Sequence, residues 1–534
     1  MSNEITLDQD SRLPESEPQA QPKESLAPVS VAERISAMDI LRGFALIGIL
    51  LMNIEWFNRP ISALMAFDFE QVGADYASSW LVLVFVQGKF YKLFSLLFGM
   101  GFAVMLLRAQ EKEQPFAGWF ARRMAVLFLL GMAHMVFFWG GDILHDYAIG
   151  GLLVLGYVLL LRIKRLQKFN HPKAFLKVGL TLLLVPLIFG LGFGTFHGAT
   201  NDFKMMEENW KEKVAVNEAF EQKKLAYDPT TNREWPKKET PEEAQSAATV
   251  EGHDDDVANE PQLSESGESL ATTTDTSENE ASEANEQPDL DAMSFEERVE
   301  FKAQRRYDGF VRRDAKLQRE DYVVQHGTYA EVTEFRKDFA ISSLGNTPVF
   351  AIFILFPMFL IGYWFVASGK MRDVAKNKNF FRGLAWIGLP VGLLLNVTAV
   401  MIIQHPASQH ADEIRGAAFN LFHYGQYALV LGYIGFVVLM TMRPRLSKLF
   451  SWMAPMGRMA LTNYIMHSAI LTYIFYGYGM GMYGEISRAP QMLMVVGIIA
   501  FQAIFSAIWL RFFKFGPLEW LWRSLTYMKF QSIR

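Results

Sequence analysis

The stretch RRMAVLFLLGMAHMVFFWGGDILHDYAIGGLLVLGYVLLLRIKR, residues 122–165, decides the class of fold. It contains two apolar runs, at about 120–139 and 144–162, and each is close to the ~20 residues that a helix needs to cross a bilayer. Basic residues flank the pair at both ends, and a short turn with a Gly-Gly pair joins them. Lipid offers no hydrogen-bond partner to backbone groups, so the runs must be helices. The stretch therefore predicts a hairpin that crosses a membrane twice.

The same pattern recurs along the chain. Similar apolar runs lie at about 39–57, 88–107, 175–196, 347–367, 384–403, 420–441, 459–478 and 491–512. We therefore expect an all-α polytopic membrane protein, a bundle of about ten transmembrane helices. Lys and Arg gather in every second short loop, including 108–123 and 162–177, and the positive-inside rule assigns these loops to the cytoplasm. Both termini are then cytoplasmic, and the chain is expected in the inner membrane of a bacterium.

Polar segments divide the chain into four parts. Residues 1–33 are rich in Glu, Pro, Ser and Gln and predict a disordered cytoplasmic tail. Two membrane halves follow, 34–197 and 346–534, with about five helices each. Between them, residues 198–345 form one large extracytoplasmic insertion. Its middle, about 228–292, is acidic and almost free of aromatic residues, which predicts disorder, whereas its flanks have the charge pattern of helices.

Composition and missing motifs exclude several functions. The chain has no cysteine, which rules out disulfides, thiolate nucleophiles and cysteine-ligated metals. It also lacks a P-loop, a dinucleotide-binding glycine fingerprint, an HExxH motif and a G-x-S-x-G elbow. We therefore expect no ATP-driven transport by this chain alone and no metal site. The basic patches are short loops beside the membrane, so nucleic acid is not an expected partner.

Polar residues within the apolar runs are the candidates for function, because they are costly in a membrane. His134 lies within the outer half of its helix and is either an interhelical hydrogen-bonding residue or a base. Asp142 is placed to cap the following helix, and it can do chemistry as well. Asn463 and His467 are four residues apart and share one helix face, which favours a cavity wall, although packing alone also explains them.

Charged residues near the helix ends have two readings each. Asp39 and Arg42 are three residues apart, so they form an ion pair or offer an anion site to a cytosolic phosphate. Lys89 either extends its ammonium group to the membrane surface or, with Lys92, faces a polar cavity. Asn53 is either a hydrogen bond between helices or part of that cavity.

Five motifs in order resemble the YeiB family of membrane proteins, also known as domain of unknown function 418. They are DILRGFALIGILLMN (39–53), GKFYKLFSLLFGMG (88–101), HMVFFWGGDIL (134–144), GRMALTNY (457–464) and FGPLEWLWRSLTY (515–527). The family is distantly similar to the transmembrane acyltransferase superfamily. The resemblance implies that an acyl group passes from cytosolic acyl-CoA to a small-molecule, sugar or lipid acceptor on the far side.

The resemblance also assigns roles to the polar residues. The acyl-CoA would bind at the inner mouth, whose residues are Arg34, Arg42, Arg122, Arg123 and Arg458. The substrate cavity would be lined by Asn53, Lys89, Trp139 and Asn463, with His134, Asp142 and His467 as the catalytic residues. Relatives carry a histidine at or just after the first helix, but residues 53–80 contain none here. The reacting group is therefore expected at His134 first and His467 second.

Two other functions fit the same features. A transporter or exporter of a small molecule or lipid would use the same polar cavity for alternating access. An envelope sensor or scaffold would use the 198–345 insertion. The sequence leaves open whether the chain is an enzyme, and it fixes no oligomeric state.

Overall fold

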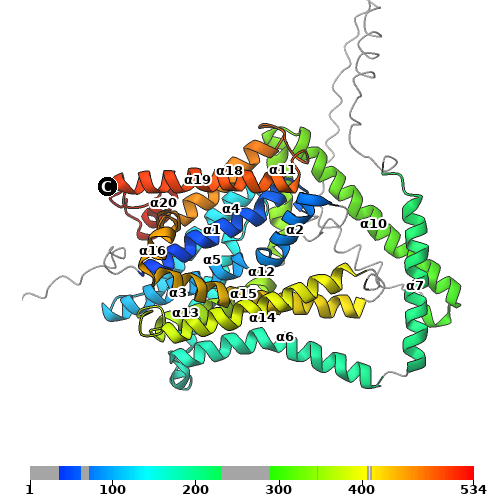
Figure 1. Ribbon diagram of the computed structural model, residues 1–534, viewed down its shortest axis with the longest axis horizontal. Coiled ribbons are helices and arrows are strands. Elements are labelled where there is room, and N and C mark those ends of the chain that lie inside the picture. The colour runs from blue at the N-terminus through cyan, green and yellow to red at the C-terminus, as the bar shows by residue number, and fades with distance from the viewer. Residues whose placement is uncertain are drawn as a thin grey trace, which may run out of the picture.

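The computed structural model describes residues 35–61, 71–200, 203–229, 289–345, 347–405, 408 and 412–534. All regular elements in these ranges are helices, which confirms the predicted all-α class. The tail 1–33, Arg34 and most of the acidic middle lie outside the described residues, so the predictions about them stay predictions. Many helices run in roughly one direction, with the C-terminus at one end of the bundle and α7 and α10 at the other (Figure 1). We call these the basic end and the insertion end.

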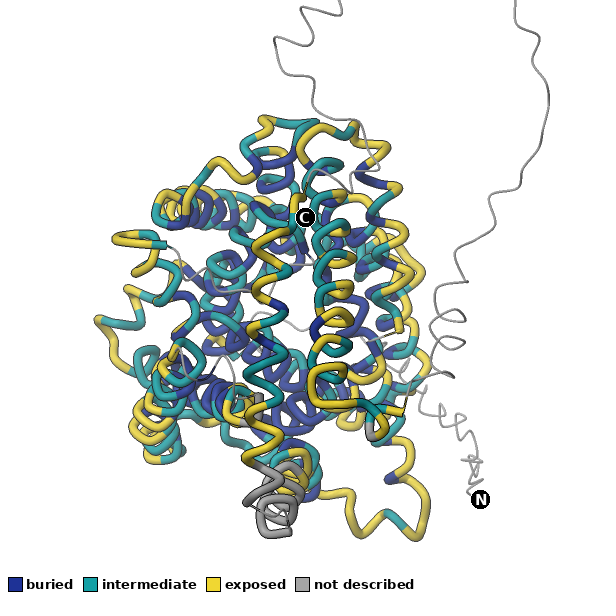
Figure 2. The backbone as a smooth tube through the Cα atoms, turned by 90° about the vertical axis from the view of Figure 1, so that its right-hand side faces the viewer, coloured by how far each residue is buried: buried dark blue, intermediate teal, exposed yellow. Residues whose placement is uncertain are grey.

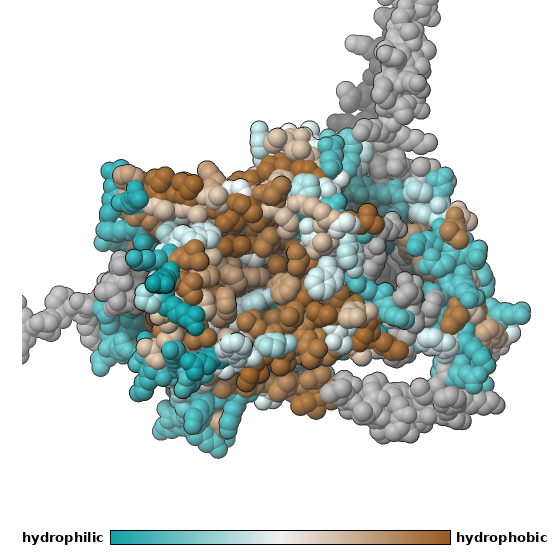
Figure 3. All heavy atoms as spheres, viewed as in Figure 1, coloured by the Kyte–Doolittle hydropathy of each residue, from teal (hydrophilic) through white to brown (hydrophobic). Residues whose placement is uncertain are grey.

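Within these described ranges, eight helical segments are long and apolar enough to cross a bilayer. They are α1 (Ser36–Phe57), α2 (Gly73–Phe85) with α3 (Phe90–Glu111), α4 (Ala117–Phe137), α6 (Pro172–Thr200), α12 (Thr347–Phe350) through α13 (Phe356–Ala367), α14 (Lys378–Gln404), α15 (Asp412–Thr441) and α19 (Arg488–Phe512). The shorter helices α5 (Leu144–Leu160) and α18 (Ala460–Phe475) occupy the two remaining predicted runs. An apolar surface covers the middle of the bundle, and polar residues gather at both ends (Figure 3). The chain is a multi-pass membrane protein.

Glycines let several of these helices touch backbone to backbone. A side chain on Gly99 of α3 would overlap the carbonyl of Phe359 in α13, and α1 meets the short helix α17 (Met453–Arg458) in the same way, at Gly43 and Gly457. Such small-residue contacts drive helix association where water is absent. Buried segments lie on the inner sides of the helices, and exposed ones lie mostly on the outside (Figure 2).

Two irregular turns shape the interior. Between α2 and α3 the chain turns at Gly88, whose φ of 78° suits glycine. Between α12 and α13 it widens into a π-helical segment, η4 (Ala351–Leu355), and Pro357 follows. Such π-helical turns are frequent at functional sites. Here Phe353 and Ile354 of η4 face the cavity that is described below.

Helices of the insertion cover the insertion end. α7 (Phe203–Leu225) packs along α10 (Phe295–His326), where Arg306 donates to Asn217 at 2.7 Å. α10 and α11 (Tyr329–Leu344) are helices in a flank for which the charge pattern predicted helix, and both begin with a capping box. α11 lies over the end of α4, because Tyr329 donates a 2.8 Å hydrogen bond to the carbonyl of Phe137. The remaining short helices are η2 (Gln167–Phe169), η3 (Leu290–Ala292), α16 (Pro444–Phe450) and α20 (Pro517–Tyr527).

The contact of α10 with the segment after α18 is expected to loosen as the pH rises. Asp321 accepts a 3.0 Å hydrogen bond from Tyr483. Burial, with Glu320 and Asp314 nearby, raises the pKa of Asp321 to about 6, although the Tyr483 hydrogen bond opposes the shift. The folded protein thus holds this proton more tightly than the unfolded chain. The stabilisation is complete below the ordinary pKa of 3.8 and is lost as the pH rises through about 6.

Hydrogen exchange tests this expectation at Gly477, whose N–H donates to the carbonyl of Val324 in α10. After correction for intrinsic exchange, its protection should be greater at pH 5 than at pH 7.5. Asp321→Asn should remove the difference, since the amide does not titrate. Equal protection at both pH values in the wild type would contradict the expectation.

Candidate functional site

A cavity of about 1880 Å³ lies inside the bundle. At the basic end its wall includes Arg42, Arg123, Arg458 and Arg523, and further along it includes Asp142, His145, Asp146 and Tyr464. Phe339 and Ser343 of α11 line it toward the insertion end. A single cavity therefore joins guanidinium groups near the basic end to carboxylates and a histidine farther inside.

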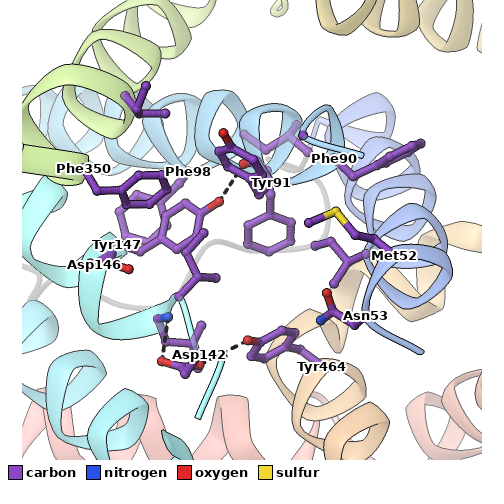
Figure 4. Close-up of a pocket in the computed structure, with 18 of the residues that line it drawn as sticks. Met52, Asn53, Phe90, Tyr91, Phe98, Asp142, Asp146, Tyr147, Phe350 and Tyr464 are labelled. Carbon is purple, nitrogen blue, oxygen red and sulfur yellow. Dashed lines mark hydrogen bonds between the residues drawn. The ribbon is translucent and has the colours of Figure 1, made fainter. Parts of the chain in front are cut away.

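Asp142 is the centre of the polar wall. It follows the Gly-Gly turn between α4 and α5, and its Oδ2 accepts from the backbone N–H groups of Leu144 at 2.8 Å and His145 at 3.3 Å. The predicted capping role is therefore present. Its Oδ1 lies 2.8 Å from Nδ1 of His134 and accepts from Tyr464 at 3.2 Å. One buried carboxylate thus ties together α4, α5 and α18 at the edge of the cavity (Figure 4).

His134 stands behind this wall, beyond the residues that line the cavity. Its side chain is only 1% exposed. Besides the contact of Nδ1 with Asp142, its Nε2 lies 2.7 Å from the hydroxyl of Ser468. Both ring nitrogens are therefore engaged by protein groups. This geometry lets His134 orient Asp142, whereas direct contact with a substrate in the cavity would need these hydrogen bonds to break.

His145 is the histidine that faces the cavity beside Asp142. Its Nδ1 lies 3.5 Å from Oδ2 of Asp142, and its Nε2 lies 3.4 Å from Oδ1 of Asp146 and 3.1 Å from the hydroxyl of Thr347. An imidazole between two carboxylates is well placed to hold a proton. As in His134, both ring nitrogens are engaged by protein groups, so a substrate would have to replace one of these partners. Sequence reasoning missed it. The available signal was its spacing, since it follows the capping Asp142 by three residues and so turns back toward the same carboxylate.

Hydroxyl and amide groups complete the central part of the cavity. Tyr147 donates a 2.7 Å hydrogen bond to the carbonyl of Tyr91, which fixes α5 against α3. Asn53, predicted as a cavity residue, does line the cavity. In Figure 4 its amide lies near Tyr464 and across the space from Asp146. Polar groups from α1, α3, α5 and α18 thus converge on one space.

The two neighbouring arginines of α4 have different environments at the basic end. Arg123 lines the cavity, and its guanidinium carbon lies 3.6 Å from the ring centre of Trp522, which is also in the wall. Arg122 is exposed on the other side of the helix. Arg42 and Arg458 line the cavity as predicted, and Arg42 also forms the expected ion pair with Asp39 at 2.8 Å.

Four other predicted residues do not line the cavity. Asn463 and His467 share a face of α18, as expected, but this face packs on α19, where His467 Nε2 lies 2.7 Å from the side-chain oxygen of Gln502. Trp139 stacks on Phe57 with ring centres 4.4 Å apart. Lys89 donates to the carbonyl of Leu83 at 2.8 Å and lies over the ring of Phe422. In each case, groups from neighbouring segments occupy the space in which we expected a cavity.

Comparisons with known proteins place the chain among relatives of unknown function. Residues 365–529 match the family described as "Protein of unknown function (DUF418)". Uncharacterized protein YxaH of Bacillus subtilis is 28% identical over 517 residues, which is 95% of this chain and 98% of that protein. Uncharacterized protein YeiB of Escherichia coli is 26% identical over 92% of this chain and 96% of its own length. No solved structure matches. The matches confirm the resemblance that the motifs predicted.

Proposed function

We propose that this chain, a membrane protein of the YeiB family, transfers an acyl group from cytosolic acyl-CoA to an acceptor that enters from the other side of the membrane. The observation that carries the proposal is the single cavity, which has arginines at one end and Asp142 with His145 farther inside. In this scheme the basic end faces the cytoplasm and the membrane is the inner membrane of a bacterium, in agreement with the positive-inside rule.

The basic end suits the donor. Coenzyme A carries several phosphate groups, and guanidinium groups bind phosphates with paired, charge-assisted hydrogen bonds. Arg123 and Arg458 line the cavity, and no described carboxylate forms an ion pair with either of them. Each has a buried Nε–H without a hydrogen-bond partner. The two guanidinium groups therefore keep unused hydrogen-bonding capacity, which supports an anionic ligand at this end.

The inner part of the cavity suits the transfer step. Once the acceptor replaces Thr347 at Nε2, His145 would take the proton from the acceptor hydroxyl or amine, and the freed lone pair would attack the thioester carbonyl. Asp142 and Asp146 would stabilise the imidazolium. As the carbon–sulfur bond breaks, His145 would return the proton to the leaving thiolate, so that the acylated acceptor and free coenzyme A result. The amide of Asn53 is the donor best placed to stabilise the negative carbonyl oxygen.

Binding of acetyl-CoA tests the donor end, and the neighbouring arginines supply a matched pair. Arg123→Ala should weaken the binding of radiolabelled acetyl-CoA about tenfold or more, because charged hydrogen bonds contribute about 1.5–3 kcal/mol. Arg122→Ala removes the same charge from the exposed side of α4 and should change the affinity by less than about twofold. Equilibrium dialysis of the purified full-length proteins measures both.

Two outcomes would contradict the proposal. Folded wild-type protein that neither binds acetyl-CoA nor transfers its label would exclude the enzyme. Movement of a substrate across sealed vesicles without any acyl-CoA would favour the transporter.

A further inference from the structure

Lys92 carries a fully buried ammonium group that the transfer step does not use. It lies in the first turn of α3 and is 0% exposed. Its Nζ donates to the side-chain oxygen of Gln426 and lies 3.3 Å from Nδ1 of His423. The ring of Tyr427 lies 4.4 Å from the same nitrogen. Within the ranges that the structure covers, no carboxylate forms an ion pair with Lys92.

This arrangement is incomplete for a cation inside a membrane. A charged group buried away from water is costly unless an opposite charge accompanies it. Gln426, His423 and Tyr427 offer an amide oxygen, a ring nitrogen and an aromatic face, which are dipoles rather than charges. His423 is itself held by the hydroxyl of Tyr427 at 3.0 Å. These groups offer Lys92 hydrogen bonds but no opposite charge, so an anionic ligand nearby would stabilise its protonated form.

The group lies directly behind the cavity wall. All three of its partners line the cavity, and so does its neighbour Tyr91. The carbonyl of Tyr91 accepts a hydrogen bond from Tyr147, and Tyr147 follows Asp146 in the sequence. An anion that touched Gln426 and His423 would therefore occupy the same cavity as the proposed reacting group.

The adjoining wall is apolar and reaches the outside of the bundle. It is formed by Leu183 and Pro186 of α6, Phe350 and Phe353 near η4, and Phe419 of α15. Phe353 is 46% exposed and Phe419 is 52% exposed, so this wall continues onto the lipid-facing surface. A molecule with a hydrocarbon part can lie along it while its polar group is inside.

We propose that Lys92, with His423, Gln426 and Tyr427, binds the anionic headgroup of an amphiphilic acceptor, a lipid that carries a phosphate or carboxylate. That this lipid accepts the acyl group rests on the proposed function, whereas the binding of its anionic headgroup does not. The same site would hold the headgroup while the hydroxyl or amine of the lipid reaches His145. Its hydrocarbon chains would lie against the apolar wall.

The full-length protein, purified in micelles of mixed phosphatidylcholine and phosphatidylglycerol, provides the test. Native mass spectrometry counts the phospholipids that each protein retains. We expect the wild type to prefer phosphatidylglycerol, and Lys92→Met to reduce the retained phosphatidylglycerol about tenfold. Lys92→Arg keeps the charge and should keep the lipid. Lys89→Met is the matched control, because it also removes a buried lysine of the same segment, whose ammonium group is instead held by a backbone carbonyl.

Three results would overturn the proposal. They are a wild type without preference for phosphatidylglycerol, a folded Lys92→Met protein that retains as much of it as the wild type, and an equal loss in Lys89→Met. The measurement on the wild type needs no variant, so it tests the proposal even if the Lys92→Met protein does not fold. Glycerol phosphate, added as a competitor, distinguishes a lipid headgroup from a free phosphate. If it displaces the lipid, the site binds anions, and its ligand can be water-soluble. Acetyl-CoA binding is measured separately, so loss of the enzyme hypothesis leaves this result readable.

Discussion

Replacement of Asp142 by asparagine is expected to lower acyl transfer by about 10³-fold or more, while the protein still folds. Asparagine has nearly the same shape but only one accepting oxygen, whereas both oxygens of Asp142 accept hydrogen bonds. Either His134 or the N–H groups of α5 would then face an amide NH₂. In serine hydrolases, where a carboxylate likewise orients a histidine, the same change costs about 10⁴-fold. Initial rates of label transfer from acetyl-CoA measure the effect.

Two further measurements make the Asp142 result specific. Acetyl-CoA binding should be nearly unchanged in Asp142→Asn, because the donor phosphates are proposed to bind at the basic end. The free energy of unfolding should fall by about 1–3 kcal/mol, the usual cost of an unsatisfied buried polar group. Asp321→Asn, which lies in the insertion, serves as the carboxylate control. A transfer rate in Asp142→Asn close to that of the wild type would remove this residue from the mechanism.

The substitution Gly457→Ala should lower stability by about 3 kcal/mol or more. A methyl group at this position would overlap the carbonyl oxygen of Asp39 and lie 2.8 Å from the backbone nitrogen of Gly43. Both are backbone atoms of α1, so no side chain can move aside and the two helices must separate. Overpacking of a core usually costs about 1–3 kcal/mol, and a clash with backbone lies at or above the upper end of that range. The shift also displaces Arg42 and Arg458, which flank the contact.

Thermal unfolding in detergent and the yield of monodisperse protein report the effect of Gly457→Ala. Gly497→Ala is the matched control, since it changes a glycine inside the long helix α19 where nothing beyond the surrounding helix backbone lies within 4 Å of the added methyl. It should be neutral or slightly stabilising, because alanine favours helix. If the two variants had the same midpoint, the contact between α1 and α17 would not limit stability.

Local features of this fold could be predicted from the sequence, because they depend on residues close together in the chain. The helices occupy the apolar runs, Asp142 caps α5, and Asp39 pairs with Arg42. Asn463 and His467 share a face, as their spacing requires. Periodicity does not say which neighbour covers a face, however. That face packs on α19, and the same limit applies to Arg122 and Arg123, of which only one reaches the cavity.

The parts of the candidate site that sequence reasoning missed depend on distant segments. His145 lies beside Asp142 and Asp146 because of its spacing, but Thr347, which also contacts its ring, comes from the second membrane half. Lys92 was considered only as a possible cavity cation, since Gln426 and His423 lie more than 300 positions further along the chain. Thr347, Gln426 and His423 all come from the second membrane half, and local pattern does not show how this half packs against the first.

The same packing sets an order for biosynthesis. The turn that carries Asp142 belongs to the first membrane half, but Tyr329, Thr347, Tyr464 and Ser468, which engage the turn or the residues beside it, are all made much later. Until they arrive, His134 has only Asp142 as a partner, and Asp142 has only His134 and the first residues of α5. A ribosome must therefore finish almost the whole protein before the proposed reaction centre is complete, and until then these polar groups are costly in the membrane.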